Sequence, residues 1–176
     1  MQKIAAALPL LPGCDAALQA QNIAYEIRPD GLYAADAQVS AANAVISSYT
    51  AADALAAAQQ QQLALAAATR WDVITGGHTT AAGIPLATDA ISITLITSLY
   101  NASQSGVSGP FNFKDRSGSW QSLSAAQVAA LYQDISAWVQ SVYNHENTLH
   151  QQIMAAGQTW QQVMLINAAA GFPANS

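Results

Sequence analysis

Charged side chains are scarce in this sequence. Only 9% of its 176 residues are Asp, Glu, Lys or Arg, whereas roughly a quarter are charged in a typical soluble domain. The five basic residues are scattered, the net charge is −5, and the pI is near 4.7. Because nucleic acids and anionic membranes are bound through clustered Lys and Arg, this composition argues against both as partners.

Cysteine and long apolar runs are also lacking. Cys14 is the single cysteine, so it cannot form an intrachain disulfide, and we expect it to be a small buried filler in a reducing compartment. No apolar run approaches the roughly 20 residues that span a bilayer. One alternative remains at the N-terminus, where Ile4 to Leu11 followed by Leu11-Pro12-Gly13-Cys14 looks like a short lipoprotein signal that would leave Cys14 lipidated.

Motifs for catalysis or metal binding are missing as well. The sequence has no Gly-rich phosphate loop, nucleophile elbow or Cys-rich metal motif. His145 and His150 are five residues apart, about 140° around a helix, so they cannot easily share a metal. Glu146 and His150 are four apart and predict a surface charge pair, and His78 is expected to be a polar strand residue. We therefore predict no enzyme activity, no cofactor and no metal site.

What the sequence does contain in its first part is a hairpin followed by helices. Alternating apolar residues and a Pro29-Asp30-Gly31 turn predict a β-hairpin over residues 22–34. Asp36 is expected to cap a first helix, and Thr50 with Asp53 to form a capping box for a second.

The second helix, residues 54–68, consists only of Ala, Gln and Leu. Ala and Gln bury little area, so such a helix is only marginally stable alone. We expect it to pack along copies of itself or against another protein; a solvated linker helix or a flexible Gln-rich spacer is the alternative. The candidate interface residues are Val39, Ala42, Ile46, Tyr49, Leu55, Gln59, Gln62 and Leu63.

The second part of the sequence predicts a small antiparallel sheet with two to three helices. We expect a strand at Arg70–Ile74, a turn at Gly76-Gly77, a second strand within residues 78–86, and a loop over residues 101–109. We further expect a hairpin over residues 111–123, then a long helix, and then a short helix within residues 159–167. Thr88 or Asp89 is expected to cap the helix after the first sheet, Ser124 the long helix, and Gly157 to end it.

The predicted fold class is therefore α+β. Its expected parts are an N-terminal arm and hairpin (1–35), an Ala/Gln-rich connecting or oligomerisation helix (36–69), an α+β domain (70–167) and a C-terminal tail (168–176). Trp138 lies on the apolar stripe of the long helix and is expected in the core. Trp71 and Trp120 lie on predicted strands, where they serve either as core residues or as surface aromatics that bind glycans.

Several short motifs occur in a fixed order in the second part. They are Arg70-Trp71-Asp72-Val73-Ile74-Thr75-Gly76-Gly77, then Gly83-Ile84-Pro85 with Thr88-Asp89, then Asn112-Phe113-Lys114, Gly118-Ser119-Trp120, and Leu123-Ser124-Ala125-Ala126-Gln127. Together, over about residues 70–166, they resemble an uncharacterised domain family encoded in the tail and tail-fibre modules of bacteriophages and prophages. That family supplies no established catalytic residues.

The resemblance implies a virion context. We expect a structural component of a phage tail, associated with tail fibres or the distal tail, present in the virion tail and in the host cytoplasm during assembly. Its expected partners are copies of itself, a trimer included, and other tail or tail-fibre proteins. The alternatives are a tail-fibre assembly chaperone and a protein that binds or degrades host-envelope glycans.

Overall fold

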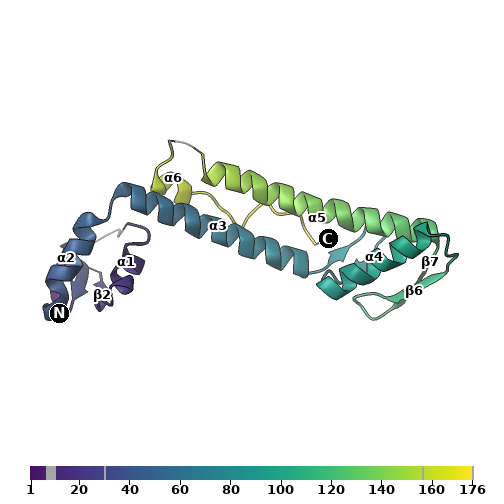
Figure 1. The fold of residues 1–176 in the computed structure, drawn as a ribbon, viewed down its shortest axis with the longest axis horizontal. Coiled ribbons are helices and arrows are strands. Elements are labelled where there is room, and N and C mark those ends of the chain that lie inside the picture. Colours follow the sequence, from purple (N-terminus) through teal and green to yellow (C-terminus); the bar gives the residue numbers. More distant parts are fainter. Residues whose placement is uncertain (7–10, 30, 156, 176) are drawn as a thin grey trace. The chain divides into compact units, whose positions relative to one another are not determined.

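The computed structural model describes residues 1–6, 11–29, 31–155 and 157–175. It combines helices with small antiparallel sheets (Figure 1), so the expected α+β class is confirmed. The chain divides into two compact units: the first unit holds residues 1–64 and 151–167, and the second unit holds residues 65–150 and 168–176. This division differs from the expected boundaries because two long helices, α3 (Ala51–Thr75) and α5 (Ala125–Ile153), each contribute to both units.

The first unit contains a three-stranded antiparallel sheet. The predicted hairpin is confirmed as β2 (Tyr25–Arg28) and β3 (Gly31–Ala34), and β1 (Gln2–Ala6), which was not predicted, pairs with the other edge of β3. Residue 30 of the predicted turn and residues 7–10 of the lipoprotein-like segment lie outside the described residues.

Two helices, α1 (Cys14–Ala20) and α2 (Val39–Ser48), build the core of the first unit with this sheet. Cys14 is buried, as expected, and carries a free thiol. The buried core residues are Leu18, Ile23, Leu32, Ala34, Ala42 and Val45.

Of the two helix starts predicted in the first unit, one is wrong and one is confirmed. Asp36 does not cap α2, because a short 3-10 helix, Asp36–Gln38, precedes α2. The side-chain amide of Gln38 joins this 3-10 helix to the loop before β2: it accepts from the Ala24 N–H and donates to the Asn22 carbonyl. The capping box before α3 is confirmed. The Thr50 N–H donates to Asp53 Oδ2 at 2.8 Å, and the Asp53 N–H donates to Thr50 Oγ1 at 3.2 Å.

Helix α3 is longer than predicted. It runs through Arg70–Ile74, so the strand predicted there is wrong. The helix that the strong helix formers of residues 54–68 favour continues without a break to Thr75, and Val73 and Ile74 pack against the core of the second unit from the helical conformation. The helix then stops at the expected glycine pair, where Gly77 has φ +91°, a value that favours glycine.

The second unit places two hairpins and α4 (Ala90–Gln104) beside α5 (Figure 1). The first hairpin is short, with β4 (His78–Thr79) paired to β5 (Pro85–Leu86), and the second pairs β6 (Phe111–Lys114) with β7 (Trp120–Leu123) as predicted. Helix α4 extends to Gln104, into the segment that was predicted to be a loop. The buried core residues are Leu86, Ile96, Phe111, Phe113, Leu123, Val128, Leu131, Ile135, Trp138 and Val142.

The predicted caps at Asp89 and Ser124 are confirmed, whereas α5 ends before the predicted stop at Gly157. The Asp89 carboxylate accepts from the backbone N–H groups of Ile91 and Ser92 at the start of α4. Ser124 and Gln127 form a capping box before α5, with the Ser124 N–H donating to Gln127 Oε1 at 2.9 Å. Helix α5 ends at Ile153, before Gly157, and α6 (Trp160–Met164) lies within the segment expected to hold the short final helix.

Candidate functional site

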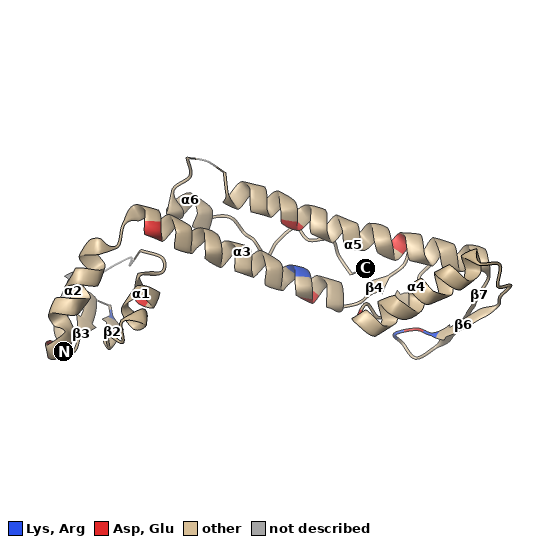
Figure 2. Cartoon of the chain, in the orientation of Figure 1, with Lys and Arg blue, Asp and Glu red and all other residues tan. Residues whose placement is uncertain are grey.

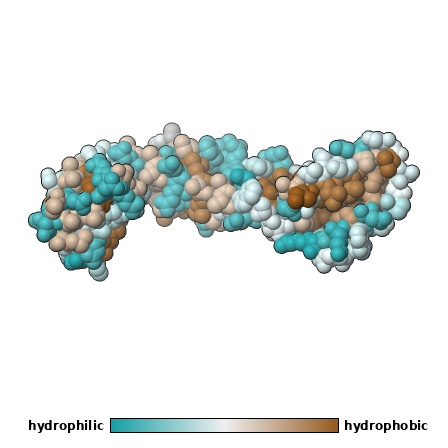
Figure 3. All heavy atoms as spheres, turned by 60° about the horizontal axis from the view of Figure 1, so that its bottom comes forward, coloured by the Kyte–Doolittle hydropathy of each residue, from teal (hydrophilic) through white to brown (hydrophobic). Residues whose placement is uncertain are grey.

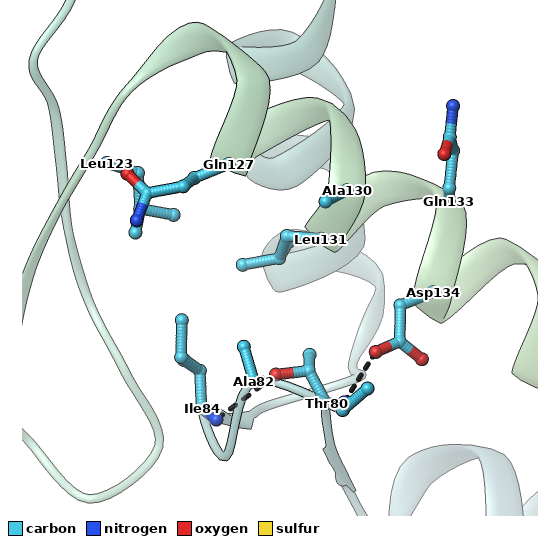
Figure 4. Close-up of a pocket in the computed structure, with 10 residues that line it drawn as sticks. Thr80, Ala82, Ile84, Leu123, Gln127, Ala130, Leu131, Gln133 and Asp134 are labelled. Atoms are coloured by element: carbon cyan, nitrogen blue, oxygen red, sulfur yellow. Dashed lines mark hydrogen bonds between the residues drawn. The ribbon is translucent and has the colours of Figure 1, made fainter.

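The candidate site is a groove of about 490 Å³ in the second unit. It lies between the turn that joins β4 to β5 and the first half of α5 (Figure 4). Ile84 and Leu131 point into it from opposite sides, whereas Gln133 points away. The residues that line it are Thr80, Ala81, Ala82, Ile84, Leu123, Gln127, Ala130, Leu131, Gln133 and Asp134.

Polar groups of the groove form hydrogen bonds to other residues that line it. Asp134 Oδ2 accepts from the Ala81 N–H at 2.6 Å, and Thr80 Oγ1 accepts from the Ile84 N–H at 3.1 Å. Asp134 is also the only charged residue among those that line the groove. Its interior is therefore largely apolar and suits an uncharged side chain better than a charged substrate.

A buried histidine lies beside Asp134. His78 Nε2 lies 3.2 Å from Asp134 Oδ1, and its ring stacks on Trp138 with the centroids 4.6 Å apart. His78 is in β4, as predicted, but its side chain is only 8% exposed, and Nδ1 has no hydrogen-bond partner within the described residues. Sequence reasoning missed the cluster; the spacing of Asp134 and Trp138, one helical turn apart, was the available signal.

Glu146 has a different partner from the predicted one. Glu146 Oε2 lies 2.9 Å from Arg70 Nε, so the pair joins α5 to α3 and replaces the expected pair with His150. The Arg70 guanidinium also lies 5.1 Å from the centre of the Tyr143 ring. The helical conformation of residues 70–74 makes this possible, because it turns Arg70 toward α5.

The histidines of α5 have separate surroundings. His145 Nε2 is 2.9 Å from the Ala170 carbonyl, whereas His150 is exposed. In the part of the chain that the structure describes, no group of three His, Cys, Asp or Glu residues is placed to hold a metal ion. Nor is any described helix both long and apolar enough to cross a membrane.

The two candidate surface aromatics are both exposed. Trp71 is 60% exposed and lies on α3, not on a strand as predicted. Trp120 is 73% exposed and lies on the predicted strand, β7. Of the two alternatives, core residue or surface aromatic, both side chains therefore fit the second. The ammonium of Lys114 lies 6.0 Å from the Trp120 ring centre. Trp138 is buried in the core, as expected.

Asp115 organises the connection between β6 and β7. Its Oδ1 accepts from the Ser117 hydroxyl at 2.6 Å and from the backbone N–H groups of Ser117 and Ser119, and its Oδ2 accepts from the Gln121 amide at 2.7 Å. These hydrogen bonds hold the pKa of the Asp115 carboxyl below its ordinary value, and the bond from the Ser117 hydroxyl has the largest effect.

The eight candidate interface residues are all at least half-buried within the first unit. Gln59 donates to the Ile153 carbonyl at 3.1 Å, and Tyr49 donates to the Pro12 carbonyl at 2.6 Å. Ala42 and Gln62 are buried, and Val39, Ile46, Tyr49, Leu55, Gln59 and Leu63 are half-buried. The chain thus covers much of the surface that was expected to face a partner, and segment 151–167 supplies part of the cover.

Comparison with known proteins places the chain in a family. The family described as "Domain of unknown function (DUF4376)" matches residues 57–170. No curated protein and no solved structure matches the chain. Since the family match spans well over half of the sequence and includes all the motifs of the second unit, the chain belongs to the DUF4376 domain family.

Proposed function

We propose that this protein is a structural component of a bacteriophage tail, associated with tail fibres or the distal tail, and that it acts through protein–protein assembly. The observation that carries the proposal is the apolar groove between the β4–β5 turn and α5. Thr80 and Asp134 are engaged in holding the turn, so the groove offers Ile84 and Leu131 as contacts for an apolar side chain of another protein.

The surface of the chain supports an assembly role over an enzymatic one. Charged residues are few along the described part of the ribbon, apart from the run Lys114-Asp115-Arg116 after β6 (Figure 2). Protein interfaces are depleted of charge at their centres, because a charge that is buried without a partner is costly. The phage setting itself comes from the resemblance carried by the ordered motifs from Arg70-Trp71 to the start of α5.

The first test is quantitative mass spectrometry of gradient-purified virions from a phage or prophage that encodes the chain. The copy number relative to the major tail-tube protein is expected to be a simple multiple of three or six, as tail symmetry requires. A protein that is abundant in the lysate but absent from the particles would contradict the proposal and favour a tail-fibre assembly chaperone.

The second test asks whether the groove is the contact surface. Ala130→Glu places a charge in the groove from an exposed position on α5, whereas Ala126→Glu adds the same charge about one turn earlier, outside the residues that line it. We expect Ala130→Glu to lose incorporation into particles and Ala126→Glu to keep it. Equal incorporation of the two variants would show that the groove is not the docking site.

A further inference from the structure

The β6–β7 hairpin turns one face to the core and the other to solvent. Its inner side chains, two phenylalanines and Leu123, are buried in the core of the second unit. Because successive side chains of a strand point to opposite faces, a second set of residues lies on the outer face. This set, which we call the outer hairpin face, consists of exposed residues in two cross-strand pairs: Asn112 with Ser122, and Lys114 with Trp120.

Trp120 is the largest group of the outer hairpin face. Its side chain is 73% exposed, although the buried face of the hairpin already fixes the strand on which it lies. The Lys114 ammonium lies 6.0 Å from the centre of the indole ring, at the outer limit of a cation–π contact, so it borders the ring without covering it. The face of an aromatic ring is electronegative and attracts the weakly positive C–H groups of a ligand. The ring is therefore available for stacking.

The charge of the hairpin differs in sign from that of the whole chain. Residues 111–123 contain two of the five basic residues, Lys114 and Arg116, and one acidic residue, Asp115. The Asp115 carboxylate is buried and accepts from the Gln121 amide, and the Arg116 guanidinium donates to a backbone carbonyl. Lys114 forms no ion pair with any described residue. Its charge is open to an anionic group of a ligand, because acidic residues more than about 8 Å away are largely screened at physiological salt.

Asn112 and Ser122 add hydrogen-bonding groups next to the ring. Neither side chain has a hydrogen-bond partner within the described residues. An amide and a hydroxyl each donate and accept hydrogen bonds, and an ammonium donates up to three. Two residues along a strand advance about 7 Å, and residues paired across two strands lie about 5 Å apart. The four side chains therefore cover an area that suits one or two sugar rings.

This combination of groups fits a sugar better than a protein. A sugar ring has a face of C–H groups that packs on an aromatic ring and a rim of hydroxyls that donate and accept hydrogen bonds. In a protein interface a central Trp is surrounded by contacts that exclude water, whereas every neighbour of Trp120 on the outer hairpin face is polar. Figure 3 shows that the second unit presents hydrophilic as well as hydrophobic surface. We infer that the outer hairpin face binds an acidic saccharide, with a sugar ring on Trp120 and the acidic group on Lys114.

Binding of the purified full chain to an array of immobilised saccharides tests the inference. The array holds neutral, carboxylated and phosphorylated saccharides, and their dense display compensates for the weak affinity of a small exposed site. We expect acidic saccharides to bind about two- to fivefold more strongly than neutral ones of the same backbone, as an exposed ion pair allows. Comparison of the carboxylated with the phosphorylated members then identifies the acidic group.

Two substitutions separate the roles of the ring and the ammonium. Trp120→Ala should weaken binding about two- to tenfold, because the stacking contact is lost, and Trp120→Tyr should keep most of the binding. Lys114→Gln should remove the preference for acidic over neutral saccharides. The matched control is Trp71→Ala, which removes another exposed Trp, on α3, and should bind like the wild type. Circular dichroism confirms that the variants are folded.

Three results would overturn the inference: a wild-type chain that binds no saccharide, equal binding of acidic and neutral saccharides, and equal losses in Trp120→Ala and Trp71→Ala. If the wild type binds no saccharide and Trp120→Ala is lost from virions, the outer hairpin face contacts a protein instead. The inference goes beyond the assembly role and does not depend on it, because the assay uses the purified chain. A chain that binds acidic saccharides but is absent from virions would refute the tail role alone.

Discussion

Removal of the Asp134 carboxylate should loosen the turn that forms one wall of the groove. In Asp134→Ala, His78 loses the partner of Nε2 while Nδ1 already has none within the described residues. The His78 side chain is only 8% exposed, and a buried polar group left without a partner costs about 1–3 kcal/mol. The Ala81 N–H is exposed, so water replaces its bond at a cost of about 0.5 kcal/mol.

The expected loss in the free energy of unfolding is therefore about 1.5–3.5 kcal/mol, a large share of the 5–15 kcal/mol typical of a folded domain. Urea unfolding followed by circular dichroism measures it, and near-ultraviolet spectra report on Trp138, on which His78 stacks. Asp72→Ala is the matched control, because Asp72 is an exposed carboxylate on α3 and should change stability by less than about 0.5 kcal/mol. Equal effects of the two substitutions would refute the role given to Asp134.

Two further predictions concern the β6–β7 hairpin and the start of α5. Because the pKa of Asp115 is lowered in the folded state, its stabilising contribution is present above the ordinary carboxyl pKa and is lost as the pH falls through the lowered value. Urea stability should thus decline as the pH falls below about 5 and on through the lowered pKa, and part of that decline should vanish in Asp115→Asn. Ser124→Ala removes the hydroxyl that accepts from the Gln127 N–H and should destabilise the protein by about 1 kcal/mol; a thermal melt of Ser122→Ala, an exposed serine on β7, is the comparison.

The features that the sequence predicted correctly are those set by neighbouring residues. The capping pairs Thr50–Asp53 and Ser124–Gln127 each span three residues, and Asp89 caps through the next two or three. The turn at Gly77 requires only its own backbone conformation. Such features depend on spacing along the chain and therefore can be found without the fold.

The features that were missed depend on residues far apart in the sequence. His78 and Asp134 are separated by 56 positions, and no motif marks them as partners. The helix through Arg70–Ile74 was mistaken for a strand because Trp71, Val73 and Ile74 also suit a strand. Its helical state is stabilised by packing on the core of the second unit and by the contact of Arg70 with Glu146. The burial of Gln59 and Gln62 likewise depends on segment 151–167.

Burial then separates the residues that the fold requires from those that it does not. In the Arg70-Trp71 pair, Arg70 reaches Glu146 on α5, whereas Trp71, the next residue along the helix, is 60% exposed. Ile91 and Trp120 are likewise 81% and 73% exposed. Folding gains little from large apolar side chains that remain in water, and polar residues would serve equally well at these three positions. Their exposure is explained if they contact other molecules, so binding experiments should begin with these three side chains and with the groove.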